Sequence, residues 1–239
     1  MKRSIFLSII SIFASQWLLA QVPDNSVVGG QNLEQISANA SSSVRVFDSR
    51  YEGIKGSPYL LDDWLAASLV TDNGQKIENV EIKLNLTEDG VFVKNENGGV
   101  LRLRSSAVDT IQLTENEQMF VSVENLLGQN QYEDSYYLEL MERGEKVSLV
   151  ARRYKSYMEA NFKGAYSAGR TYDQYIDETD FFFLKNGQLS EVKTSIKSLA
   201  EGLGMDKKQL RNYINKYEIN IREEEGIKKL VKYFNMGVE

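Results

Sequence analysis

The side chains best suited to chemistry are carboxylates and aromatic rings in two stretches of the chain. One stretch reads GSPYLLDDW over residues 56–64, and the other reads YDQYIDETD over residues 172–180. Paired carboxylates can act as acid and base in glycoside hydrolysis, and clustered acidic oxygens can hold calcium. The candidate ligand-binding residues of the two stretches are Tyr59, Asp62, Asp63, Trp64, Tyr172, Tyr175, Asp177 and Asp180.

Each stretch also has a purely structural explanation. Pro58 makes the residue before it extended, so that the first stretch forms a stiff entry to a sheet and its large side chains cover one end. Adjacent carboxylates rarely converge on one point. A catalytic pair would therefore need Asp62 or Asp63 to meet Asp177 or Asp180 within about 10 Å. The second stretch lacks the spacing of an EF-hand loop. We predict no catalytic residue and no metal ligand.

The chain contains no cysteine and no histidine. The absence of cysteine excludes disulfides, thiolate nucleophiles and Cys-ligated metals. The absence of histidine excludes Ser-His-Asp triads and histidine-containing zinc sites. Catalysis would have to rest on carboxylates, tyrosines, lysines or hydroxyl groups, and we expect no cofactor.

The first twenty residues have the layout of a secretory signal peptide. Lys2 and Arg3 precede an apolar run from Ile5 to Leu19, and Ala20 is followed by polar sequence. The run is short for a membrane anchor, the alternative interpretation, which needs roughly 20 residues. We predict cleavage after Ala20, no transmembrane segment after cleavage, and a periplasmic or secreted protein. A lipoprotein is excluded, because lipidation after signal-peptide cleavage needs a cysteine and the chain has none.

Residues 21–43 are small and polar, which predicts a flexible segment, and residues 44–192 show the pattern of an antiparallel sheet. Apolar and polar side chains alternate over residues 80–86, 101–104, 136–141 and 147–151. Turn dipeptides stand at residues 73–74, 89–90, 97–98, 143–144 and 186–187, and all but Arg143-Gly144 are Asn-Gly or Asp-Gly. We predict a meander of roughly eight to ten strands, as a curled sheet, a sandwich or a partial barrel.

Residues 156–180 break this alternation. They contain four tyrosines and two isolated glycines. We predict a long excursion from the sheet that is either a mobile loop or a binding loop.

Residues 193–239 change to a helical period. Apolar stripes predict three short amphipathic helices, so that the fold class is α+β, an antiparallel β-meander followed by three C-terminal helices. We expect Leu199, Leu203, Leu210 and Ile214 to be buried together, and Asp206 to cap the second helix.

The string LAEGLGMDKKQLRNYI over residues 199–214 resembles the helix-turn-helix of bacterial DNA-binding regulators. In that resemblance, residues on the exposed side of the second helix would read bases. These are Lys207, Lys208, Arg211, Asn212 and Lys216. Residues 193–239 hold ten Lys/Arg and seven Asp/Glu, whereas the whole chain has a net charge of −6, so the rest is strongly acidic. With an acidic body and a signal peptide, we expect no nucleic-acid partner.

The leader, the segment around residues 51–64, the alternating strands and the lysine-rich tail together resemble a group of uncharacterised exported bacterial proteins. Their shared segment has the form YEGxxGSPYLxDDW, and the match is clearest at residues 51–53 and 56–64. The resemblance covers most of the chain after the leader. It implies export, and it implies no activity and no site residues.

We expect an exported, non-catalytic binding or accessory protein of the cell envelope, with an envelope component or a glycan as its partner. The alternative is a secreted carboxylate-based glycan hydrolase, and a remote third possibility is a DNA-binding regulator. The sequence leaves the oligomeric state open.

Overall fold

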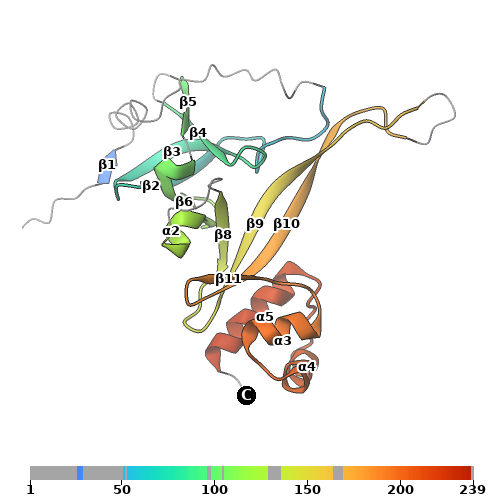
Figure 1. The fold of residues 1–239 in the computed structure, drawn as a ribbon. Coiled ribbons are helices and arrows are strands. Elements are labelled where there is room, and N and C mark those ends of the chain that lie inside the picture. The colour runs from blue at the N-terminus through green and yellow to red at the C-terminus, as the bar shows by residue number, and fades with distance from the viewer. Residues whose placement is uncertain are drawn as a thin grey trace, which may run out of the picture.

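The computed structural model describes residues 26–28, 51, 53–95, 98–103, 105–128, 136–163 and 169–237. The strands are β1 (Ser26–Val28), β2 (Leu65–Thr71), β3 (Lys76–Asn85), β4 (Gly90–Lys94), β5 (Val100–Leu103), β6 (Val108–Leu113), β7 (Met119–Ser122), β8 (Tyr137–Glu142), β9 (Ser148–Met158), β10 (Gln174–Lys185) and β11 (Gln188–Glu191). The helices are the 3-10 turn η2 (Ser105–Ala107), α2 (Val123–Leu127), α3 (Ile196–Leu203), α4 (Lys207–Lys216) and α5 (Glu224–Met236). Figure 1 shows α3, α4 and α5 grouped at one end of the sheet.

The described strands form one open sheet. Ten of them follow the order β11-β10-β9-β8-β7-β6-β2-β3-β4-β5 with antiparallel neighbours, and β1 pairs in parallel with β3. Strand β2 departs from chain order because it lies between β6 and β3. The predicted α+β class and antiparallel meander are confirmed, and the sheet is not closed into a barrel.

The predicted turn dipeptides fall between consecutive strands. They join β2 to β3, β3 to β4, β4 to β5, β8 to β9 and β10 to β11, although Asn97 itself lies outside the described residues. Asn186 and Gly187 both have positive φ, at 51° and 72°, as a type I′ turn requires. Asp89 alone of its pair has positive φ, because Gly90 already begins β4. Turn position was therefore predictable from these dipeptides, and turn type less so.

Residues 1–20 lie outside the described residues, as does most of the expected flexible segment 21–43. Residues 26–28 are an exception, because they form β1 beside β3.

Two main apolar cores lie at opposite ends of the sheet. The first is formed by β2 to β7 with Tyr137 of β8. The second is formed by α3, α4 and α5 against Val147, Leu149 and Phe183. The helices therefore share a core with β9 and β10, and the expected boundary near residue 193 separates element types rather than independently packed bodies.

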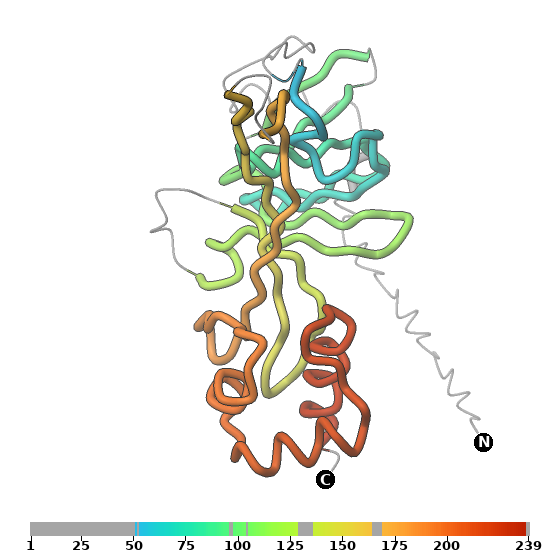
Figure 2. The backbone as a smooth tube through the Cα atoms, turned by 90° about the vertical axis from the view of Figure 1, so that its right-hand side faces the viewer, coloured from blue at the N-terminus to red at the C-terminus, as the bar shows by residue number. Residues whose placement is uncertain are grey.

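The hairpin of β9 and β10 spans both ends of the molecule. Its pairing runs from Gln174 opposite Met158 to Leu184 opposite Ser148. In Figures 1 and 2 the two strands run from the helices, past the rest of the sheet, to the far end. The predicted excursion over residues 156–180 is too long, since residues 156–158 and 174–180 are strand, whereas residues 159–163 and 169–173 lie between the strands. The outer half of the hairpin is partly exposed on both faces, so no alternation marks it in the sequence.

Strand β8 differs from the predicted alternation, in which one face of the strand is buried and the other is exposed to solvent. Tyr137, Leu138 and Glu139 are all buried. Tyr137 joins the first core. Its single hydroxyl hydrogen is shared between the carbonyl oxygens of Ser105 and Val108, each 3.1 Å from the hydroxyl oxygen. Leu138 packs with α2 on the other face. The strand is covered on both sides, which an alternating sequence does not reveal.

The helical tail packs as the sequence predicts. Leu199, Leu203 and Leu210 are fully buried, and Ile214 packs against the same core while partly exposed. The Asp206 carboxylate accepts hydrogen bonds from the first-turn amides of α4, as an N-cap does.

One close apolar approach and one set of hydrogen bonds hold the C-terminal helices on the sheet. A Cβ on Gly202 of α3 would lie 2.4 Å from Phe183 Cδ2, so only glycine allows this approach. Asn235 of α5 accepts hydrogen bonds from the amides of Lys146 and Val147 and donates to the Val147 carbonyl. The last turn of α5 is thereby held on the β8–β9 turn.

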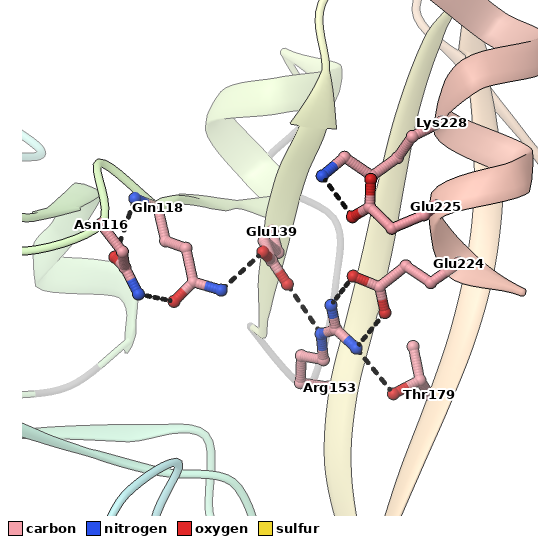
Figure 3. A network of polar contacts seen from close by, with 8 residues as sticks. All are labelled: Asn116, Gln118, Glu139, Arg153, Thr179, Glu224, Glu225 and Lys228. Atoms are coloured by element: carbon pink, nitrogen blue, oxygen red, sulfur yellow. Dashed lines mark hydrogen bonds and ion pairs between the residues drawn. The ribbon is translucent and has the colours of Figure 1, made fainter.

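Arg153 of β9 lies at the centre of the polar network shown in Figure 3. Its Nε donates to Glu139 Oε2 at 2.7 Å, and Nη1 and Nη2 each donate to a Glu224 oxygen at 2.9 Å. Nη1 also donates to Thr179 of β10, while Gln118 donates to the second Glu139 oxygen. Burial lowers the pKa of Arg153, but the hydrogen bonds to Glu224 and Glu139 outweigh it and leave the pKa raised. One side chain thus joins β8, β9, β10 and the first turn of α5.

Replacing this central cation tests how far the fold depends on it. We expect Arg153→Met to lower the free energy of unfolding by about 2–4 kcal/mol, because the buried Glu139 carboxylate loses its cationic partner. Urea denaturation followed by circular dichroism measures the change. The matched control is Glu81→Gln, which removes the exposed pair with Lys94 and should cost less than about 1 kcal/mol. Equal losses in the two variants would contradict the assigned role.

Candidate functional site

Large exposed apolar side chains concentrate at the outer end of the β9–β10 hairpin. Tyr157, Met158, Phe162 and Tyr172 are between 39% and 49% exposed, and we call these four residues the hairpin tip. Of the other two large apolar side chains that are exposed within the described residues, Leu61 lies in the first candidate stretch and Met236 ends α5. Clustered exposure of this kind marks an interaction surface more often than isolated exposure does.

The segment before β2 is paired with the start of β10, and this pairing brings the two candidate stretches together. Lys55 donates its amide to the Asp173 carbonyl, and its own carbonyl accepts from the Tyr175 amide, both at 2.9 Å. Gly56 follows with φ of 86°, and a Cβ there would lie 3.3 Å from the Tyr175 carbonyl. Glycine is needed at this crossing because of both the positive φ and the close approach.

A row of tyrosine rings continues this contact across the sheet. Tyr51 lies 6.1 Å from Tyr175 and 6.4 Å from Tyr59, and Tyr175 lies 5.8 Å from Tyr157. Tyr59 then contacts Phe92 of β4 in an edge-on arrangement at 5.9 Å. Such ring pairs favour this geometry and stabilise the contact. The structure thus joins two predicted residues, Tyr59 and Tyr175, through a third that was not among the candidates.

The other predicted aromatic residues each contact a lysine. The Lys83 ammonium lies 5.0 Å from the Tyr59 ring and 5.5 Å from the Trp64 ring. The Lys55 ammonium lies 5.0 Å from the Tyr172 ring. Tyr59 and Trp64 are partly covered, whereas Tyr172 is exposed at the tip. Tyr172 is therefore the predicted aromatic residue best placed to meet a partner.

The four predicted aspartates lie on exposed surface. Asp62 and Asp63 stand in a bend before β2, and Asp177 forms an ion pair with Lys155 across the hairpin. Asp180 raises the pKa of Tyr154, second to burial, through its charge. Three surface pockets within the described residues are lined by other side chains. None of these three pockets gathers the aspartates that the hydrolase alternative would need.

A different set of acids shares a pocket, and sequence reasoning missed it. Asp72, Asp109 and Glu124 line a hollow of about 610 Å³ beside the β2–β3 turn, β6 and α2. Burial, together with the charges of Asp72 and Glu124, raises the pKa of Asp109. Within the described residues, no group of three or more acidic or other ligating side chains is placed to hold a metal ion. The three acids come from separate segments of the chain with no common spacing, so the sequence does not relate them.

Hydrogen bonds within the loop hold the hairpin tip in shape. Asp173 accepts from the Tyr157 hydroxyl and from the Ala160 amide, both at 2.6 Å. The hydrogen bond to Asp173 raises the pKa of Tyr157 to about 12, and the same bond lowers the pKa of Asp173. Its stabilising effect is fully present between the ordinary values of 3.8 and 10.0. It is lost as the pH rises through the raised pKa of Tyr157, or falls through the lowered pKa of Asp173.

Comparison with protein-family models, with curated proteins and with solved structures finds no match. Among the residues that the structure describes, no helix combines the length and apolar character needed to cross a membrane.

Replacing Asp173 tests the bond that shapes the tip. In Asp173→Asn we expect the pKa of Tyr157 to fall from about 12 toward 10.0, since the tyrosinate no longer faces a carboxylate. Titration of the Tyr157 ring carbon by NMR gives the value. Glu159→Gln is the control, because Glu159 is only a minor cause of the shift. An unchanged Tyr157 pKa in Asp173→Asn would show that the bond does not form.

Proposed function

We propose that this chain is an exported, non-catalytic binding or accessory protein of the cell envelope, and that it binds its partner through the hairpin tip. The observation that carries the proposal is the gathering of Tyr157, Met158, Phe162 and Tyr172 on one projecting hairpin. Tyrosine and other aromatic residues dominate the energetics of protein interfaces. The inner half of the hairpin packs into the helical core through Leu149 and Phe183, so its outer end is presented on a supported base.

The chemistry of the tip favours a protein partner over a glycan. Met158 and Phe162 carry no hydrogen-bonding side-chain group, and the Tyr157 hydroxyl is used by Asp173. The Asp173 carboxylate is in turn occupied by Tyr157 and the Ala160 amide. A sugar needs polar groups placed to fix its hydroxyls, whereas an apolar pocket on a protein takes such side chains directly. Glycan binding is therefore an outcome that the test below distinguishes.

Export rests on the leader, which combines a basic start, an apolar run and a small residue at the expected cleavage position. An envelope location also agrees with the absence of cysteine, because nothing in the chain depends on the redox state of its surroundings.

The export half of the proposal predicts a defined mature end. When the whole chain is produced in a Gram-negative host, we expect the protein in the periplasmic extract to begin at Gln21. N-terminal sequencing of fractionated cells measures this. The control is Leu7→Arg, which places a charge in the apolar run and should retain the unprocessed protein in the cytoplasm. A full-length chain found only in the cytoplasm would end the envelope proposal.

The binding half predicts partner capture at the tip and not elsewhere. A photo-reactive amino acid at Phe162 or Tyr172 should give a discrete cross-linked protein band in living cells, because both side chains are exposed on the hairpin. The matched control is the same amino acid at Met236, which is 59% exposed but lies on α5. Adding Tyr157→Ser should weaken the band about tenfold, as expected for loss of an interface aromatic residue.

Equal bands from the tip and from position 236 would refute the tip as the binding surface. Labelling of polysaccharide in place of protein would replace the protein partner with a glycan.

A further inference from the structure

A groove runs along α4 at the helical end of the molecule, far along the chain from the hairpin tip. Its volume is about 690 Å³, within the range of small-molecule sites. One wall is α4, and the other is formed by the β8–β9 turn and the last turn of α5. The lining residues are Lys146, Gly204, Met205, Asp206, Gln209, Asn212, Tyr213, Lys216, Phe234 and Gly237.

The charge of this groove is positive. Lys146 and Lys216 line it from opposite walls, and Asp206 is the acid among its lining residues. Asp206 Oδ1 already accepts hydrogen bonds from the amides of Lys208 and Gln209, at 2.8 and 3.1 Å. The carboxylate therefore serves the helix end, and its negative charge is partly offset by the helix dipole.

The cations of α4 are not explained by helix stability alone. The helix contains three lysines and one arginine and no acid, and all four cations are exposed. Lys207 and Lys208 occupy the first turn, where the positive end of the helix dipole disfavours a cation by about 0.3–1 kcal/mol each. A surface that attracts anions is the physical result of this arrangement.

Tyr213 provides a second, independent observation. Its side chain is 9% exposed, it lines the groove, and its hydroxyl has no hydrogen-bond partner within the described residues. Burial raises its pKa, and the neighbouring Tyr217 and Tyr233 add to the effect, so that the hydroxyl stays protonated and able to donate. An unsatisfied buried hydroxyl destabilises a fold by about 1–3 kcal/mol unless something accepts from it.

The remaining lining supplies apolar surface and neutral donors. Phe234 lies under the Lys146 ammonium at 5.7 Å, and Met205 precedes the capping aspartate. Gln209 and Asn212 are three residues apart, so they lie on the same face of α4 and offer amide groups along the groove. The lining thus combines positive charge, hydrogen-bond donors and an aromatic ring.

We propose that this groove is a second binding site, for a small ligand with an anionic carboxylate or phosphate group and an apolar body. Lys146 and Lys216 neutralise the anion, and the Tyr213 hydroxyl donates to it. Phe234 and Met205 cover the apolar body. The site does not depend on the hairpin tip, and its failure would leave the proposed function untouched.

Heteronuclear NMR of the purified protein tests the site with benzoate, phenyl phosphate and neutral benzamide as probes. We expect saturable shifts of the amides over residues 204–216 and 234–237 with at least one anion and none with benzamide. Phenyl phosphate alone would assign the site to phosphate, and benzoate alone to carboxylate. Absence of saturable shifts with both anions, or equal shifts with benzamide, would overturn the proposal.

Three variants separate binding from structure. The double variant Lys146→Gln with Lys216→Gln should weaken anion binding about tenfold, whereas Lys197→Gln, on α3 outside the groove, should leave it unchanged. Tyr213→Phe should weaken binding about fivefold while keeping or raising the melting temperature, since it removes an unsatisfied hydroxyl. If the lysines serve only to neutralise helix ends, their variants will lower the melting temperature and leave probe affinity unchanged, which would also overturn the site.

Discussion

The guanidinium of Arg153 is the constraint on which the two ends of the molecule depend. It pairs with the buried Glu139 carboxylate of β8, and it donates two parallel hydrogen bonds to Glu224. Bidentate pairing of this kind fixes orientation as well as distance. Apolar packing is non-directional, whereas the ion-paired network sets the position of α5 on β9 and β10 through defined hydrogen bonds.

The long hairpin connects the helical core to the exposed aromatic residues at the hairpin tip. Its inner half contributes Leu149 and Phe183 to the helical core, and its outer half carries the exposed aromatic residues. The same two strands therefore pass from a buried to an exposed environment without leaving the sheet. The strand pairing continues from the packed inner half to Gln174 opposite Met158, so the backbone of the outer half is preorganised for binding.

Local features of the fold were predictable from the sequence, and long-range features were not. Asn-Gly turns, strand alternation around Ile82 and the Asp206 cap depend on residues within a few positions of each other. The outer half of the hairpin was predicted as an irregular excursion. No core covers it, so its apolar and polar side chains do not alternate along the strands. The Glu139 carboxylate looked like a solvent-facing residue, since its partners Arg153 and Gln118 come from other strands.

The candidate site shows the same division. Tyr59 and Tyr175 were identified by residue type, but only the pairing at Lys55 and the ring of Tyr51 bring them together. The acids that do gather are Asp72, Asp109 and Glu124, which no sequence spacing relates. Residue type suggested an acidic and aromatic chemistry, whereas topology decided which acids and which rings became neighbours.

The separation of 71 residues between Arg153 and Glu224 has a consequence for synthesis. Chains are made from the N-terminus, so β8 and β9 exist before the carboxylate that completes their network. Until α5 has been made, Arg153 lacks its bidentate partner. The apolar core shared by the helices and the hairpin is also incomplete, although Gly202 of α3 can already contact Phe183. The core at the helical end is therefore completed only once α5 has been made.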